Sequence, residues 1–273
     1  LDTNVIVFSV LMFIIIVLSV YKLTTSLSSF KKQSKLPVTK VSVCVLIILT
    51  FLKFSTLIVF NLPYLIFKST IEYVSESSKL GDYKTNKIGN FSNVSRPENN
   101  EDEVYIVILG ESTSRAHFGL YNYSRATTPE LNSIKEELNI YTDVISPHPH
   151  SISSITKLLT LGNYEGPNKI GDGSIIQLAN SANFETFWLS NQRPIGIYES
   201  LVTKIALSST KSKFLTTTFG VHNKVMDGAL LPELETILMD DSASKKIIFI
   251  HLMGTHLSYS NRYPEDFNTF KDI

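Results

Sequence analysis

The chain has 273 residues and is 43% hydrophobic, which is enough for one large domain or two small ones. Its 25 basic and 25 acidic residues balance to a net charge of zero, so the charge gives no sign of a nucleic-acid partner. The single cysteine, Cys44, excludes an internal disulfide and a thiolate metal cluster.

Two apolar segments near the start predict membrane spans. Residues 5–21 carry no charge and reach the lower length limit for a transmembrane helix. Residues 41–67 are long enough as well, although Lys53 must reach the interface or face neighbouring helices. A signal peptide is the alternative for the first segment, but neither a preceding basic region nor a small-residue cleavage site is present. We therefore expect a two-helix membrane anchor at residues 1–67.

The loop between the two spans, residues 22–40, holds five lysines and no acidic residue. A short loop with this bias stays in the cytoplasm, so the chain after residue 67 is expected on the opposite side of the membrane. Residues 68–103 are polar and rich in Ser and Asn, which is typical of an interfacial linker.

A soluble domain is predicted from residue 104 onward. The continuous apolar run 104–109 indicates a strand buried on both faces of a parallel sheet, and residues 184–189 and 246–251 indicate two more strands. Helical patterns occupy residues 128–138, 151–161, 174–182 and 229–239. This alternation predicts an α/β fold with a mostly parallel sheet flanked by helices.

Three polar positions follow predicted strands or begin a predicted helix. Glu111 follows a strand and Gly110, Ser151 begins a helix, and His256 follows the strand that ends at His251. The carboxyl ends of parallel strands meet at one edge, where ligands bind. Glu111 and Ser151 each have a simpler explanation, as a solvated or capping carboxylate and as a helix N-cap. Together, the carboxylate, the hydroxyl and the imidazole at one sheet edge favour metal-assisted attack on phosphorus or sulfur.

His148 and His150 precede Ser151 in a segment with two prolines. They are candidates for an acid, a ligand or a phosphate contact, or they belong to a rigid surface turn without a role. His251 lies on the strand itself and is expected to be a packed core residue.

Several motifs resemble those of the phosphoethanolamine transferases in the alkaline phosphatase and sulfatase superfamily. They are residues 107–115 (VILGESTSR), 120–131 (LYNYSRATTPEL) and 251–256 (HLMGTH), followed by Tyr259 and residues 262–264. The resemblance covers roughly residues 104–273, and the two predicted spans fit the end of that family's membrane domain.

The resemblance implies one or two zinc ions and a zinc-bound hydroxyl nucleophile at the start of the helix 151–161. The family usually has Thr there, and here the position is Ser151, with Ser153 and Ser154 as alternatives. By the same likeness Glu111 and Ser151 are metal ligands, and His256 contacts the phosphoryl group or a second metal. The candidate substrate-binding residues are His148, His150 and Asn191.

The implied reaction moves phosphoethanolamine from phosphatidylethanolamine to lipopolysaccharide or lipooligosaccharide, through a phosphoethanolamine–serine intermediate. The core heptose is favoured over lipid A as acceptor. The implied location is the bacterial inner membrane, as a multi-pass protein in contact with membrane lipid, with the catalytic domain in the periplasm. The rival enzyme is a sulfatase-like or phosphodiesterase hydrolase, but the Cys/Ser-x-Pro-x-Arg pattern of common sulfatases is missing around Ser151.

The family's later Asp-His pair, which supplies further zinc ligands, has no match before Ile273. We therefore expect this chain to be an internal piece of a longer protein, with residues 104–273 forming the first part of the catalytic domain. Such a piece is expected to bind metal poorly and to be inactive alone, and an inactive membrane scaffold remains the alternative from another class.

Overall fold

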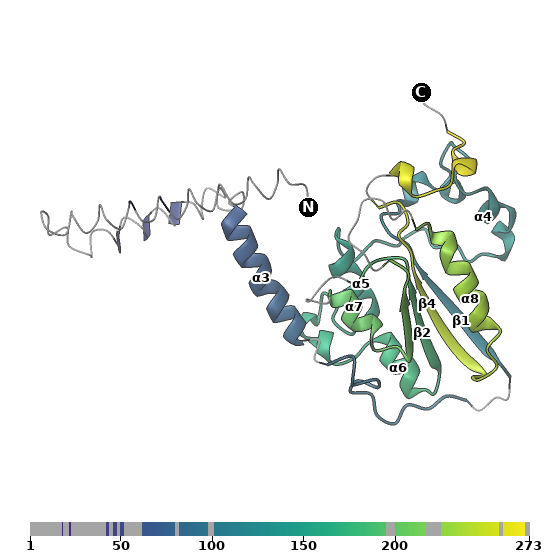
Figure 1. The fold of residues 1–273 in the computed structure, drawn as a ribbon, viewed down its shortest axis with the longest axis horizontal. Helices are drawn as coiled ribbons and strands as arrows, with labels where there is room; N and C mark the ends of the chain where they lie inside the picture. Colours follow the sequence, from purple (N-terminus) through teal and green to yellow (C-terminus); the bar gives the residue numbers. More distant parts are fainter. Residues whose placement is uncertain are drawn as a thin grey trace, which may run out of the picture. The chain divides into compact units, whose positions relative to one another are not determined.

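Figure 1 shows the computed structural model of the chain. It describes residues 62–79, 82–97, 101–194, 200–216, 225–256 and 259–270, with Leu18, Lys22 and residues 42–43, 46–47 and 50–51. The chain divides into two compact units, Leu1–Ile71 and Glu72–Ile273.

Nearly all of the first predicted membrane span and much of the second lie outside the described residues. Among the residues that are described, no helix combines the length and apolar character needed to cross a membrane. The two spans therefore stay predictions. The helix α3, Leu62–Lys79, covers the end of the second predicted span and the beginning of the predicted linker.

Four parallel strands form one sheet in the order β1-β4-β2-β3 (Figure 1). Their bounds are β1 Glu103–Leu109, β2 Glu185–Ser190, β3 Lys211–Phe214 and β4 Lys245–His251. In the register of the sheet, Leu109 of β1 and Ser190 of β2 both lie opposite His251 of β4. Three strands therefore end side by side, and the predicted parallel α/β fold is confirmed for this part of the chain.

Helices cover both faces of the sheet (Figure 1). The buried side chains of α5, α6 and α7 join Trp188 and Phe249 in one apolar cluster, whereas α8 packs on Phe187 and Ile248, whose side chains point the other way. The bounds are α4 Pro129–Ser133, α5 Ser151–Leu159, α6 Ile175–Ser181, α7 Leu201–Ala206 and α8 Leu231–Leu238. Trp188 is fully buried and stacks on Phe249 with 6.0 Å between ring centroids.

Local signals explain where these helices begin and end. Ser174 and Gln177 form a reciprocal capping box at the start of α6, which accounts for the close match to the predicted helix 174–182. The predicted helix 128–138 breaks after Ser133, whose hydroxyl donates to the Glu130 carbonyl, and resumes as a single 3-10 turn, Lys135–Glu137. The predicted helix 229–239 likewise begins with a 3-10 turn, Asp227–Leu230.

Among the strands and α-helices that the structure describes, β3 and α7 have no predicted counterpart. The strand β3 is short and mostly polar, because it lies at the edge of the sheet and leaves Lys211, Ser212 and Lys213 exposed. The helix α7 has only six residues and begins where the Ser200 hydroxyl accepts the Thr203 N–H. Both are too short for periodicity to reveal.

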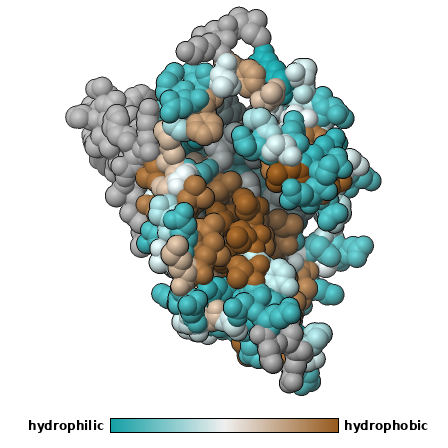
Figure 2. Space-filling model, turned by 90° about the vertical axis from the view of Figure 1, so that its right-hand side faces the viewer, coloured by the Kyte–Doolittle hydropathy of each residue, from teal (hydrophilic) through white to brown (hydrophobic). Residues whose placement is uncertain are grey.

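The expectation that residues 104–109 are buried on both faces is wrong for this structure. β1 is an edge strand, and α8 packs on β2 and β4, so Val104, Ile106 and Ile108 are 44%, 44% and 63% exposed. Figure 2 views the side of the molecule on which β1 and α8 lie in Figure 1, and a broad apolar patch stands out there.

Part of the predicted linker belongs to the packed structure of the Glu72–Ile273 unit. Tyr83 is 3% exposed, belongs to the core cluster and donates its hydroxyl to the Ile170 carbonyl at 2.8 Å. The Lys87 ammonium donates to the carbonyls of Leu207 and Ser209. The domain boundary at residues 103 and 104 stays a prediction, but residues 82–97 are not a free connector.

The asymmetry of the sheet gives a stability prediction. Ile248→Ala should lower the free energy of unfolding by about 2–5 kcal/mol, because Ile248 is fully buried on β4. The matched variant Ile108→Ala, on the neighbouring strand, should cost less than about 1 kcal/mol. Denaturant unfolding followed by the fluorescence of the single tryptophan, Trp188, measures both. Equal losses would contradict this assignment of the core.

Candidate active site

Three loops meet where β1, β2 and β4 end. Gly110 and Glu111 follow β1, Asn191 and Gln192 follow β2, and residues 252–256 follow β4. The helix α5 adds its first residue to the same place, since the Ser151 hydroxyl donates to Glu111 Oε1 at 2.7 Å. The predicted meeting of an acidic side chain with a hydroxyl at a helix start is therefore present.

Glu111 is almost completely buried, at 4% exposure, yet its carboxylate is well supplied with donors. Ser112 donates to Oε1 at 2.8 Å, and Gln192 Nε2 lies 3.4 Å from Oε2. Burial alone raises the pKa of the Glu111 carboxyl, but these hydrogen bonds, the bond from Ser151 and the charge of His256 outweigh it, so that pKa lies below its ordinary value. The Glu111 carboxylate is therefore ionised, and it can bind a cation or accept a hydrogen bond.

Ser151 is not the cap of its helix. The cap position of α5 is His150, whose side chain makes no capping hydrogen bond, and the exposed Ser151 turns its hydroxyl toward Glu111. Of the alternative hydroxyls, Ser154 makes a 2.9 Å hydrogen bond with Ser146. The N-cap explanation of Ser151 is therefore wrong, and its role as nucleophile stays a prediction.

The turn after β4 packs on the backbone of Glu111. Thr255 donates its N–H to the Glu111 carbonyl at 3.1 Å and its hydroxyl to the Ser112 carbonyl at 2.7 Å. Gly254 has a φ of +53°, and a Cβ there would lie 2.5 Å from the Glu111 carbonyl oxygen. His256 follows on this turn with an exposed side chain.

The two histidines before α5 lie close to each other. Their ring centroids are 5.5 Å apart, and His148 Nδ1 accepts the backbone N–H of His150 at 3.3 Å. His150 is exposed and His148 partly so, which leaves both rings accessible. Their contact with substrate stays a prediction.

Asn191 is fully buried and its side chain is engaged within the protein. Its amide group donates to the Val225 carbonyl and to Asp227 Oδ1, both at 2.9 Å, and its oxygen accepts the Thr216 hydroxyl at 3.1 Å. None of these contacts supports the predicted role of Asn191 as a substrate ligand, which stays untested.

His251 is a buried residue at the end of β4, as the sequence suggested. Its ring stands edge-on to Trp188, with 5.6 Å between centroids, and Nδ1 lies 3.3 Å from the Ser190 hydroxyl. Burial lowers the pKa of His251 to about 4, although the charges of Glu111 and Asp227 oppose the shift. The imidazole is therefore neutral at ordinary pH.

The oxygen atoms of Glu111 and Ser151 suit a divalent cation and would supply two of its ligands. Within the described ranges no group of three or more His, Cys, Asp and Glu side chains stands ready to hold a metal. The pair therefore fits part of a metal site.

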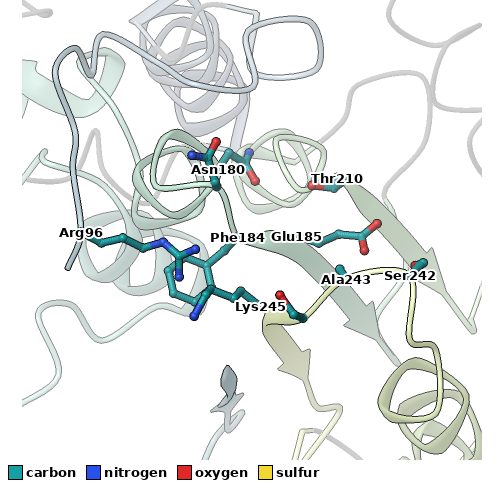
Figure 3. Close-up of a pocket in the computed structure, with 10 residues that line it drawn as sticks. Arg96, Asn180, Phe184, Glu185, Thr210, Ser242, Ala243 and Lys245 are labelled. Carbon is teal, nitrogen blue, oxygen red and sulfur yellow. The ribbon is translucent and has the colours of Figure 1, made fainter. Parts of the chain in front are cut away.

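The described part of the structure contains two cavities, and one of them lies at these residues. A cavity of about 60 Å³ is lined by Ser151, Gln192 and His251 among others. A larger one of about 740 Å³ lies at the opposite end of the sheet, where Glu185 and Lys245 begin their strands (Figure 3). Its charges are already paired, as in the 2.7 Å contact of Lys245 with Glu103 and the 2.8 Å contact of Lys211 with Glu185. The smaller cavity belongs to the candidate active site.

The sequence did not reveal four residues that shape this site: Ser112, Gln192, Asp227 and Thr255. Gln192, Asp227 and Thr255 act through contacts with residues distant in sequence, which leave no local pattern. Ser112 acts on the adjacent Glu111, but neither spacing nor periodicity distinguishes this serine from others. Only Gly254 offered a signal, because a glycine before the predicted His256 indicates a tight turn.

A family model described as Sulfatase matches residues 103–273. Phosphoethanolamine transferase EptC of Escherichia coli O18:K1:H7 (strain RS218 / NMEC) is 29% identical over 191 residues, which are 68% of this chain and 33% of that protein. The chain thus spans about a third of the length of this relative.

Solved structures show the same fold. The crystal structure of the C-terminal periplasmic domain of EptC from Escherichia coli, in complex with Zn, is 29% identical with a TM-score of 0.60, over 64% of this chain and 50% of that one. The integral membrane protein lipooligosaccharide phosphoethanolamine transferase A (EptA) from Neisseria meningitidis is 20% identical with a TM-score of 0.53, over 82% of this chain and 43% of that one. At that identity the second likeness concerns the fold alone.

The close approach at Gly254 predicts a large effect of a single methyl group. Gly254→Ala should lower the free energy of unfolding by at least about 1–2 kcal/mol, because of the left-handed backbone and the contact with Glu111. Gly228→Ala is the control, since a Cβ at Gly228 meets nothing within 4 Å. Denaturant unfolding compares the two variants, and a Gly254→Ala protein as stable as the control would count against this geometry.

The neutral His251 predicts a pH dependence of stability. Between pH 6.5 and about 4 the unfolded chain binds a proton at this imidazole that the folded chain does not. The stability present above pH 6.5 should therefore fall as the pH drops through this window, by up to roughly 3 kcal/mol. His251→Gln should flatten this part of the profile in denaturant unfolding. An unchanged slope would show that another group is responsible.

Proposed function

Because the chain belongs to the sulfatase family, we propose that the whole protein transfers phosphoethanolamine from phosphatidylethanolamine to a lipopolysaccharide-type acceptor, with Ser151 as nucleophile. The observation that carries this proposal is the 2.7 Å hydrogen bond from Ser151 to the buried carboxylate of Glu111. The name of the relative EptC supports the transferred group.

In the first step Ser151 Oγ attacks the phosphorus of the donor lipid. The new Oγ–P bond forms as the bond between phosphorus and the diacylglycerol oxygen breaks, and the proton that Ser151 Oγ loses ends on that leaving oxygen. The serine hydroxyl already directs its proton at Glu111, so the lone pairs of Oγ remain available on its other side. A zinc ion bound by Glu111 and Ser151 would supply positive charge that lowers the pKa of the hydroxyl.

The position of Ser151 at the start of α5 also suits an anionic substrate. The first N–H groups of a helix have no partner within it, and the helix dipole adds partial positive charge there. The exposed imidazoles of His150 and His256 can donate to phosphoryl oxygens as the negative charge shifts between them. These groups would stabilise the substrate and the transition state.

In the second step an acceptor hydroxyl or phosphate oxygen attacks the same phosphorus. The Oγ–P bond breaks, the proton that the attacking acceptor group loses passes to Ser151 Oγ, and the phosphoethanolamine group leaves on the acceptor. We propose the core heptose as acceptor in preference to lipid A, on the likeness of the Gly-Glu-Ser-Thr and Thr-Thr-Pro-Glu-Leu segments and the shortage of cysteine.

The proposed location follows from the predicted anchor and from the relatives. A bacterial inner-membrane protein with residues 1–67 as part of a multi-pass anchor and residues 104–273 in the periplasm would meet both lipids at one membrane surface. The name of the solved EptC domain calls it periplasmic, and that of EptA calls it an integral membrane protein. Tethering raises the effective concentration of donor and acceptor at the site.

The nucleophile is tested by Ser151→Ala in the full-length protein. We expect transfer to fall by at least roughly 10³-fold, because no other hydroxyl donates to Glu111 from α5. Mass spectrometry of tryptic peptides should find the phosphoethanolamine adduct on Ser151 in the unchanged protein and none in the variant. Ser154→Ala is the matched control and should keep both adduct and activity.

An adduct on Ser153 or Ser154 would show that the wrong hydroxyl was assigned. Release of free phosphoethanolamine without any modified glycolipid would favour the hydrolase instead. Comparing the lipopolysaccharide of cells with and without the gene then locates the added group on the core or on lipid A.

A further inference from the structure

The carboxylate of Asp227 links two of the loops that form the site. Its Oδ1 accepts the backbone N–H of Met253 at 2.8 Å and the side-chain amide of Asn191 at 2.9 Å, while Oδ2 accepts the N–H of Gly254 at 2.8 Å. Asp227 belongs to the 3-10 turn before α8, so it comes from a segment separate from both β2 and β4.

Hydrogen-bond donors, not cations, hold this carboxylate. In the described part of the chain, no lysine or arginine forms an ion pair with Asp227. Hydrogen bonds from N–H groups to an ionised carboxylate are roughly twice as strong as neutral ones. The N–H groups of Met253 and Gly254 each bond to a different oxygen of Asp227. These two bonds also fix the orientation of the peptide group between Met253 and Gly254.

The turn that Asp227 holds is the one that supports the proposed metal ligand. Gly254 lies directly against the Glu111 backbone, and the next residue, Thr255, donates to the carbonyls of Glu111 and Ser112. The turn ends at His256, whose N–H donates to the Met253 carbonyl at 3.3 Å. A displacement of this turn would therefore move both Glu111 and His256 relative to Ser151.

Asn191 in turn fixes Asp227. It is fully buried, its oxygen accepts from Thr216, and its amide group spans the Val225 carbonyl and Asp227 Oδ1. The side chain that follows β2 thus orients a carboxylate that clamps the turn after β4.

We propose that Asp227, oriented by Asn191, is a positioning residue that holds the 252–256 turn so that Glu111 and His256 face Ser151. This inference rests on the proposed function of the site. Among the described residues, Asp227 makes no hydrogen bond to Ser151 or Glu111, so its effect passes through the turn.

The test is Asp227→Asn in the full-length protein, assayed by diacylglycerol release from phosphatidylethanolamine in detergent micelles. An amide has one acceptor oxygen, so at least one of the three donors then faces an NH₂ group. We expect kcat to fall about 10–100-fold, as for residues that orient metal ligands, with KM nearly unchanged. Asp240→Asn is the matched control, because Asp240 also accepts a backbone N–H, from Ser242, but lies at the other end of the sheet.

Hydrogen exchange supplies a readout that does not depend on activity. The amides of Met253 and Gly254 should exchange faster in Asp227→Asn, while those within β4 stay protected. If β4 amides also lose protection, the milder variant Thr216→Val is used in place of Asp227→Asn. Thr216→Val removes only the hydroxyl that donates to Asn191. We expect that variant to lower kcat about 5-fold, as the loss of one net hydrogen bond would.

The outcomes separate the two proposals. A faster-exchanging turn with unchanged kcat would overturn the positioning role of Asp227, and so would turn amides that exchange as before. An active Ser151→Ala protein without a serine adduct would instead overturn the proposed function, whatever Asp227→Asn does.

Discussion

The hydrogen bond from Ser151 to Glu111 Oε1 is the interaction on which the site depends, because it joins the end of β1 to the start of α5. It requires a carboxylate that remains ionised at 4% exposure. Ser112 and Gln192 supply further donors that offset the cost of burial, so the pKa of Glu111 lies below its ordinary value. An ionised carboxylate beside an exposed hydroxyl is then available for a cation.

The parallel sheet explains why these residues meet. β4 lies between β1 and β2, and the three strands end in register, so their loops are forced together. The turn after β4 packs on the Glu111 backbone through Gly254 and Thr255, and the Asp227 carboxylate holds that turn through the Met253 and Gly254 N–H groups. The fold thus positions the site largely through side chains that bond to the backbone of a neighbouring loop.

The sequence predicted the elements that have strong local signals: the strands β1, β2 and β4, the helix α6 and the helix after Ser151. It missed β3 and α7, which are short, and it could not show that β1 is exposed, since burial depends on what packs on a strand. The exposed Val104, Ile106 and Ile108 form an apolar surface along β1. The chain as a whole matches half of the solved EptC domain. In the site, Glu111 and Ser151 were predictable from strand and helix ends, whereas the donors Gln192 and Thr255 depend on tertiary contacts alone.

The most direct test is a crystal structure of the complete protein grown with zinc, with the metal located by anomalous scattering. We expect one ion with a Glu111 carboxylate oxygen and Ser151 Oγ both within roughly 2.0–2.3 Å of it. An ion bound elsewhere, or held by one of these residues without the other, would contradict it.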